Sequence, residues 1–278
     1  MKILTWNIQA TKGCDNNFDL SRIVDQIRKY GDLDVICLQE ISRNIPDLNA
    51  DDQPLLINQH FPDYEMIWGP GFSAPGTTGC RIEFGNLTLV KRGLLKNSHL
   101  HRLPGPPVQA MQMPRTMVET VITTGKQAVT IFNTHLAFHS ESERVAQIDA
   151  LTDLRDQIIA KSNLPELNNP VGPYRFANSC NSVILCGDLN IDSQSDVFVR
   201  NVIDRRWIDC WYVNETRDSH KSRDPTCGCY DDVQWPQGPH VRDYFLVSEN
   251  IAEKTVNIEV DVETNASDHQ PVFLEISL

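Results

Sequence analysis

The sequence lacks both a long apolar run and an excess of positive charge. A membrane-spanning helix needs about 20 mostly apolar residues in succession, so we expect no transmembrane segment. The first residues, Met1–Asn7, become polar too soon for a signal peptide, and we expect a cytoplasmic location. Lys and Arg number 25 against 37 Asp and Glu, a formal net charge of −12. This charge opposes attraction of a polyanion, so a nucleic acid partner is possible but disfavoured.

Cysteine is present, but not in a pattern typical of a disulfide framework or a zinc site. The eight cysteines are scattered, and Cys37 and Cys186 lie inside apolar runs, where we expect reduced core side chains. Cys227 and Cys229 are close and have histidines nearby, but there is no second cysteine pair. Zinc binding by this pair is therefore disfavoured, and its role stays open.

Short apolar runs rich in β-branched and aromatic residues alternate with turn-rich segments, which predicts many strands. With 278 residues and 40% hydrophobic content, the chain is long enough for a full core, and we expect one domain over residues 1–278. The predicted strands are Lys2–Ile8, Asp34–Gln39, Tyr64–Trp68, Glu83–Lys91, Met117–Thr123, Ala128–His135, Val183–Asp188, Val241–Val247, Thr255–Val260 and Pro271–Ile276.

Three segments have helical spacing of apolar residues. The first follows a cap at Asp19, and the second begins at Ser140 with Glu143 in capping-box position. The third follows Ser195 and carries Val199, Val202 and Ile203. Many strands with few helices between them predict an α/β fold with two packed, mostly antiparallel sheets and helices outside.

Four long segments rich in Gly, Pro, Asn or charge are predicted as loops, and loops this long are often functional. Tyr230 and Trp235, in the last of them, either stack on a substrate or cover core edges. The four segments are Gly69–Gly79, His99–Pro114, Ser162–Ser182 and Asn214–Pro239.

Polar residues stand at the ends of the predicted strands. The end of one antiparallel strand and the start of its neighbour share an edge of the sheet, so we expect these residues to converge on one rim. Four of them close apolar runs and two precede one: Asn7, Glu40, His135 and Asp188, then Asp243 and His269.

The residue types at this rim suit phosphate chemistry. Ionised Glu40 beside a core is costly unless a divalent cation neutralises it, although a capping acid is the alternative. Gly187 permits a sharp turn, after which Asp188 can accept a proton from water and Asn190 can donate to a phosphoryl oxygen. An Asx-turn is the structural alternative for this Asp-x-Asn segment.

Further candidates are basic or amide side chains. His135 and His269 can hold a phosphate from two sides, with Asp243 favouring a protonated histidine. Arg115 is a candidate for binding a phosphate oxygen or for a surface ion pair. Asn86 either hydrogen-bonds near the site or serves a turn.

Six short motifs, taken in order, resemble the endonuclease/exonuclease/phosphatase (DNase I-like) superfamily. The resemblance implies a four-layer α/β sandwich and hydrolysis of phosphate esters with Mg²⁺ or Mn²⁺. The motifs are Trp6-Asn7, Gln39-Glu40, Thr134-His135, Gly187-Asp188-Leu189-Asn190, Arg242-Asp243 and Ser267-Asp268-His269.

The resemblance also implies a role for each residue. Asn7, Glu40 and Asp268 would hold the metal, and one or two ions stay open. The remaining motif residues would be catalytic, with Asp188 activating or orienting the attacking water: His135, Asp188, Asn190, Asp243 and His269.

Three hypotheses follow. The first is a phosphodiesterase or nuclease acting by in-line water attack, and Thr134-His135 favours such members over abasic-site endonucleases. The second is a sphingomyelinase-like phosphodiesterase of phospholipid head groups, and the third is a non-catalytic binding protein on the same scaffold. In each case the sequence leaves the oligomeric state and the exact phosphate ester open.

Overall fold

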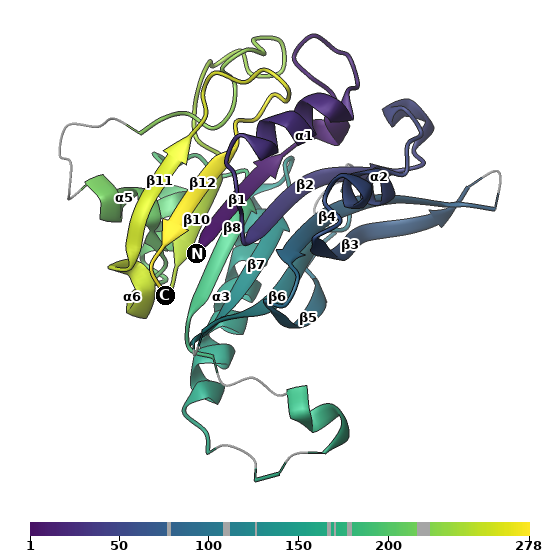
Figure 1. Ribbon diagram of the computed structural model, residues 1–278. Coiled ribbons are helices and arrows are strands. Elements are labelled where there is room, and N and C mark those ends of the chain that lie inside the picture. The colour runs from purple at the N-terminus through teal and green to yellow at the C-terminus, as the bar shows by residue number, and fades with distance from the viewer. Residues whose placement is uncertain are drawn as a thin grey trace.

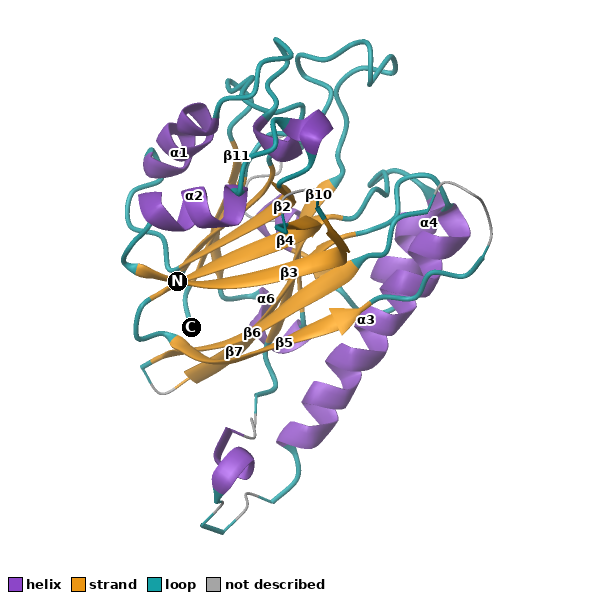
Figure 2. Ribbon diagram, turned by 90° about the vertical axis from the view of Figure 1, so that its right-hand side faces the viewer, coloured by secondary structure: helices purple, strands orange, loops and turns teal. Residues whose placement is uncertain are grey.

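Two six-stranded sheets pack face to face, with helices on both outer faces, in the computed structural model of the chain (Figures 1 and 2). This arrangement confirms the predicted four-layer α/β sandwich. The structure describes residues 1–76, 79–107, 112–125, 127–165, 168–169, 171–176, 180–215 and 223–278.

The first sheet has the strand order β11-β12-β1-β2-β4-β3, and only β1 and β2 run parallel. Its edge strand β3 is longer than the sequence predicts, because its pairing with β4 continues to Pro75. The bounds are β1 Lys2–Asn7, β2 Val35–Arg43, β3 Tyr64–Pro75, β4 Arg81–Lys91, β11 Thr255–Val260 and β12 Val272–Ile276.

The second sheet has the order β5-β6-β7-β8-β10-β9, and only β7 and β8 run parallel. The edge strand β5 escapes sequence prediction because its residues are polar on both faces. The bounds are β5 Leu95–Arg102, β6 Thr116–Thr124, β7 Gln127–His135, β8 Val183–Asp188, β9 Ile208–Asp209 and β10 Asp243–Val247.

The helices cover the outer faces, α1 and α2 over the first sheet and α3 and α4 over the second (Figure 2). The predicted caps form: Asp19 accepts from the Ser21 amide, and Ser140 accepts from the Glu143 amide at 3.2 Å. The bounds are α1 Leu20–Arg28, α2 Gln53–His60, α3 Glu141–Ser162, α4 Asp196–Phe198, α5 Cys210–Glu215 and α6 Glu249–Ala252, with short helical turns η1 Gln9–Thr11, η2 Pro46–Leu48, η3 Gly172–Phe176 and η4 Val199–Ile203.

Alternation along the strands produces separate apolar layers. Ile3 and Cys37 face the second sheet, whereas their neighbours Leu4 and Leu38 face α1 and α2. Cys37 and Cys186 are reduced and buried between the sheets, as the sequence predicts. Among the described residues, none of the helices combines the length and apolar character needed to cross a membrane.

Several boundaries differ from the sequence prediction. Gly69–Pro75 and His99–Arg102, expected in loops, belong to β3 and β5, and the start of the last predicted loop belongs to α5. In the third helix Val202 is buried, but Val199 and Ile203 are 47% and 38% exposed. Some parts of the predicted loops lie outside the described residues: 77–78, 108–111, 166–167, 170, 177–179 and 216–222.

The two chain ends lie side by side at one end of the sandwich (Figure 1). The Met1 ammonium group donates to the Ile276 carbonyl at 2.7 Å, which closes β1 against β12. Because β1, β2, β7 and β8 all begin near this closed end, their carboxyl ends meet at the opposite rim.

Candidate active site

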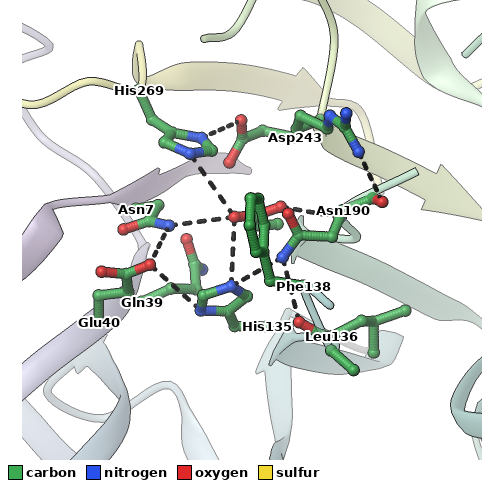
Figure 3. Close-up of polar contacts among 12 residues, drawn as sticks. Asn7, Gln39, Glu40, His135, Leu136, Phe138, Asn190, Asp243 and His269 are labelled. Carbon is green, nitrogen blue, oxygen red and sulfur yellow. Dashed lines mark hydrogen bonds and ion pairs between the residues drawn. The ribbon is translucent and has the colours of Figure 1, made fainter. Parts of the chain in front are cut away.

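The strand registers bring the predicted polar residues together at that rim. Asp188 lies opposite His135 on one side and Asp243 on the other, across β7, β8 and β10. In the facing sheet, Asn7 ends β1 opposite Gln39. Hydrogen bonds join the two sheets across this rim, and Figure 3 shows the side chains pointing toward one another.

A β-bulge in β2 turns Glu40 toward the rim. The pairing with β4 shifts between Leu38 and Ile41, and Glu40 has a φ of 57°. A bulge redirects one side chain, and a left-handed conformation outside glycine costs about 1 kcal/mol or more. The buried strand around it therefore holds Glu40 in a strained but fixed position, with 27% of its side chain exposed.

Gly187 lets β7 and β8 approach closely just before Asp188. Its φ is 125°, and a Cβ there would stand 1.9 Å from the Thr134 carbonyl oxygen. Only glycine fits, so the close parallel pairing that places His135 beside Asp188 depends on this position.

Asp188 is the centre of the polar network and is almost fully buried. Its Oδ2 accepts from Asn7 Nδ2 at 3.0 Å and lies 3.3 Å from His135 Nε2 and 3.7 Å from His269 Nε2. Its Oδ1 accepts from the Asn190 amide at 2.8 Å. Burial raises the pKa of Asp188, and the charge on His269 opposes that rise.

His269 is held as a charged donor. Its Nδ1 lies 2.8 Å from Asp243 Oδ2, so this ring nitrogen donates to the carboxylate. Burial alone would lower the pKa of His269, but the carboxylates of Asp243, Asp188 and Asp268 outweigh it and raise that pKa well above 6.5. Although Asp188, Asp243 and His269 offer ligand atoms within 4.8 Å of one another, a protonated imidazole donates hydrogen bonds and does not ligate a metal.

His135 has the opposite character. Burial, together with the charges of Arg115 and His269, moves its pKa well below 6.5, so the ring is neutral. Asn190 Nδ2 donates to His135 Nε2 at 2.9 Å and to the Leu136 carbonyl at 3.1 Å. The Asn190 nitrogen that we expected to meet a phosphoryl oxygen is thus engaged, and it orients His135. Among the described residues, neither the buried His135 Nδ1 nor the buried Asn190 Oδ1 has a hydrogen-bond partner, and Glu40 Oε1 lies 3.8 Å from His135 Nδ1.

The three residues predicted as metal ligands lie on the other side of the rim. Asn7 Nδ2 donates to Glu40 Oε1 at 3.0 Å. Asp268 Oδ2 accepts from Gln234 Nε2 at 2.9 Å and from Trp235 Nε1 at 3.1 Å. Asp268 is 2% exposed.

The charge at this position fits a divalent cation. Burial raises the pKa of Glu40 to about 7, and the negative charges of Asp268 and Asp188 add to the rise. The carboxylates of Glu40 and Asp268 are hard oxygen donors, which Mg²⁺ and Mn²⁺ prefer. A bound cation would remove the cost of ionising Glu40, so the residues present fit the expected metal.

A cavity of about 200 Å³ opens onto Glu40, Asp188 and the two histidines. Arg115 lines it together with Phe138 and Trp235, and a second cavity of about 320 Å³ continues past Arg115 toward Glu143. The Arg115 Nε is buried without a partner, and burial lowers the pKa of its guanidinium although the charges of Glu40 and Asp188 favour its protonated form. A cation that faces a cavity, with no ion-paired carboxylate among the described residues, suits an anionic ligand.

The other predicted residues take structural positions. Asn86 is buried and donates to the Thr116 carbonyl at 2.9 Å, which ties β4 to β6 beside Arg115. Trp235 is buried in the cavity wall and bonds to Asp268. Tyr230 is 47% exposed, donates to the Val262 carbonyl, and does not line the 200 Å³ cavity.

Phe138 and Thr226 are among the residues at the site that escaped sequence prediction. Phe138 is 43% exposed and stands edge-on to Trp235, with ring centroids 5.8 Å apart, in front of the network in Figure 3. Thr226 Oγ1 accepts from the backbone amides of Arg242 and Asp243 and fixes the start of β10. The only signal for Phe138 is its place in the turn after His135, and nothing in the sequence marks Thr226.

Cys227 ties the last long loop to the rim. Its backbone bridges to His240 and His269, and its Sγ lies 3.3 Å from His240 Nε2. Burial raises the thiol pKa of Cys227 well above its usual range, so the protonated thiol is a poor metal ligand.

Comparisons with known proteins agree with this architecture. A model of the endonuclease/exonuclease/phosphatase family matches residues 4–269. A family protein from Leptotrichia buccalis has a TM-score of 0.70 at 17% identity over 100% of both chains. A mannosyl-6-phosphatase from Bacteroides thetaiotaomicron has a TM-score of 0.69 at 15% identity over 100% of both chains. A truncated Caenorhabditis elegans TDP2 has a TM-score of 0.64 at 20% identity, covering 98% of this chain and 95% of that chain.

No curated protein sequence matches the chain significantly. The solved structures share its fold at low sequence identity. This similarity shows the fold and does not show that the chain acts on the same substrates. The family model, in contrast, spans the whole rim from Asn7 to His269. The chain therefore belongs to the endonuclease/exonuclease/phosphatase family, whose members are hydrolases acting on phosphate esters.

Proposed function

We propose that this chain, as one unit over residues 1–278, is a cytoplasmic, divalent-metal-dependent hydrolase of phosphate esters, acting by in-line attack of water on phosphorus. The observation that carries the proposal is the pair of buried histidines with opposite charge states on either side of Asp188. Neutral His135 and charged His269 can both donate hydrogen bonds to a phosphate. Such donors stabilise the negative charge that develops on the phosphoryl oxygens in the transition state.

Asp188 positions the attacking water and accepts its proton. A general base works best with a pKa near the working pH, and burial moves the Asp188 pKa in that direction. Its two oxygens already accept from Asn7 and from the Asn190 backbone, so the carboxylate has a fixed orientation. The unpartnered Asn190 Oδ1 is a second acceptor for the water.

The two histidines hold the phosphate. Protonated His269, kept charged by Asp243, donates from Nε2 to a phosphoryl oxygen and stabilises negative charge there. Neutral His135 offers its unpartnered Nδ1 hydrogen to another oxygen, because Asn190 fixes the tautomer through Nε2. Asp243 and Asn190 are therefore positioning residues.

Glu40 and Asp268 would hold the divalent ion, with Asn7 beside them. When bound, the ion supplies Lewis-acid stabilisation of the phosphoryl oxygens and of the leaving alkoxide. Asn7 links the two halves of the site, since its amide donates to both Glu40 and Asp188. A substitution at Asn7 would disturb both carboxylates together.

Arg115 and the cavity beyond it bind the rest of the substrate. The guanidinium would pair with a non-reacting phosphate oxygen, and the 320 Å³ cavity next to it would take an organic substituent. A phosphodiester, including a nucleic acid end, and a phosphomonoester both suit this arrangement.

Hydrolysis of a phosphodiester, bis(p-nitrophenyl) phosphate, and a monoester, p-nitrophenyl phosphate, tests the proposal. Each is assayed with Mg²⁺, with Mn²⁺ and with EDTA. We expect hydrolysis of at least one ester that EDTA abolishes and added metal restores. A protein that hydrolyses neither these esters nor sphingomyelin vesicles would support a non-catalytic protein instead, and hydrolysis of the vesicles alone would assign the lipid head group.

A further inference from the structure

A cluster of two histidines and one glutamate lies on the outer face of the second sheet, away from the rim. His99 and His101 are two residues apart on β5, so their side chains share one face of the strand. Glu119 on β6 is the register partner of His99. His101 Nε2 lies 2.6 Å from Glu119 Oε2, and His99 Nδ1 lies 3.6 Å from Glu119 Oε1.

The cluster is separate from the catalytic rim. Glu119 pairs with Phe132, which packs on α3, whereas the next residue, Asn133, points inward and bonds to the Leu87 carbonyl of the first sheet. His135 has the inward orientation of Asn133, because side chains alternate along a strand. The cluster thus lies on the opposite face of the sheet from His135 and about 10 Å away from it along the strands, at about 3.4 Å per residue.

We propose that His99, His101 and Glu119 form a surface site for a transition-metal ion of the zinc class. Two histidines and one glutamate are a known three-residue ligand set for Zn²⁺, which leaves a fourth position for water or a partner group. Ligand atoms on a tetrahedral ion with bonds of about 2.0–2.1 Å stand about 3.4 Å apart. The two nitrogen-to-oxygen distances, 2.6 Å to Glu119 Oε2 and 3.6 Å to Glu119 Oε1, lie on either side of that value, so the two histidines contact different oxygens of one carboxylate.

The exposure of the three residues fits a site that ions reach from solvent. The Glu119 side chain is only 9% exposed and is fixed by its strand, which gives the site one rigid ligand. His99 is 58% exposed and His101 is 32% exposed, so both rings can turn toward an ion. Their ring centroids are 6.2 Å apart, against roughly 5 Å for two imidazoles on one tetrahedral ion, so the exposed His99 ring would turn when both bind one ion.

Calorimetric titration of the chelator-treated protein with Zn²⁺, with Mg²⁺ in excess, tests the site. We expect His101→Ala and His99→Ala each to bind one Zn²⁺ fewer than the wild type, and Glu119→Gln to bind it at least about tenfold more weakly. His60→Ala is the matched control, because His60 is an exposed histidine at the end of α2. It should bind zinc as the wild type does.

Equal zinc stoichiometry and affinity in the wild type, His99→Ala and His101→Ala would overturn the proposal. His99 is mostly exposed, so its variant keeps the test valid if Glu119→Gln unfolds. Co²⁺ gives a second readout, since a tetrahedral site with nitrogen ligands produces visible absorption that His99→Ala should remove. Zinc binding is measured without a phosphate ester, so the result is independent of the proposed hydrolase activity.

Discussion

Replacing Glu40 with glutamine should make the metal-free protein more stable and remove its hydrolytic activity. In the unfolded chain Glu40 ionises near its usual pKa of 4.5, whereas in the fold its pKa is about 7. Between these values the folded state keeps a proton that the unfolded state has released. The ionisation of Glu40 therefore lowers the free energy of unfolding as the pH rises from 4.5 to 7. Above pH 7 the full cost of ionising Glu40 in the fold is present.

The size of the effect follows from that difference. A rise in pKa from 4.5 to about 7 corresponds to about 3 kcal/mol, and solvent contact by the exposed quarter of the side chain reduces this to about 2 kcal/mol. Glutamine keeps the oxygen that accepts from Asn7 Nδ2 and removes the charge. For a chain of 278 residues, about 2 kcal/mol is a rise in Tm of roughly 3–4 °C.

Thermal unfolding of the wild type and of Glu40→Gln, in EDTA at pH 5 and at pH 8, measures this change in stability. The variant should melt higher at pH 8, and the difference should shrink at pH 5, where Glu40 is protonated. Adding Mg²⁺ should raise the Tm of the wild type only. Glu259→Gln, an exposed change on β11, should leave the Tm unaltered. A Glu40→Gln protein that melts at or below the wild type at pH 8 would refute the reasoning.

Three further perturbations test other parts of the site. Asp243→Asn should lower the pKa of His269 toward 6.5, so hydrolysis that needs protonated His269 should be lost at lower pH than in the wild type; an unshifted pH–rate profile would contradict this. Arg115→Met should raise KM about tenfold or more with little change in kcat, with Arg115→Lys between the two, and an unchanged KM would exclude Arg115 from substrate binding. Gly187→Ala should destabilise the protein by about 3 kcal/mol or more in urea unfolding, because the new methyl group meets the Thr134 carbonyl; a neutral change would show that β7 can move.

The sequence predicts most of this rim because its residues follow apolar runs. Asn7, His135 and Asp188 each end a buried strand, so the periodicity that predicts the strand also locates the polar residue. Glu40 is different, since only the bulge in β2 turns it toward Asn7, and a bulge depends on pairing with β4. The sequence shows the Gln39-Glu40 motif, but it does not show the left-handed backbone conformation of Glu40.

Tertiary contacts decide what the sequence leaves undetermined. β5 is a strand because it pairs with β6, not because its own residues favour one, and this pairing places His99 opposite Glu119. Phe138 belongs to the site only because the turn after His135 folds back toward Trp235. The hydrogen bond from Asn190 Nδ2 to His135 Nε2 likewise forms only because β7 and β8 are neighbours.

The rate of metal-dependent phosphate ester hydrolysis by Asp188→Asn tests the central claim most directly. Asparagine keeps the size of the side chain but is a far weaker base, so we predict a loss of kcat of about 10²-fold or more with saturating Mg²⁺. Near-UV circular dichroism should show that the fold of Asp188→Asn is unchanged. An Asp188→Asn protein as active as the wild type would contradict the account.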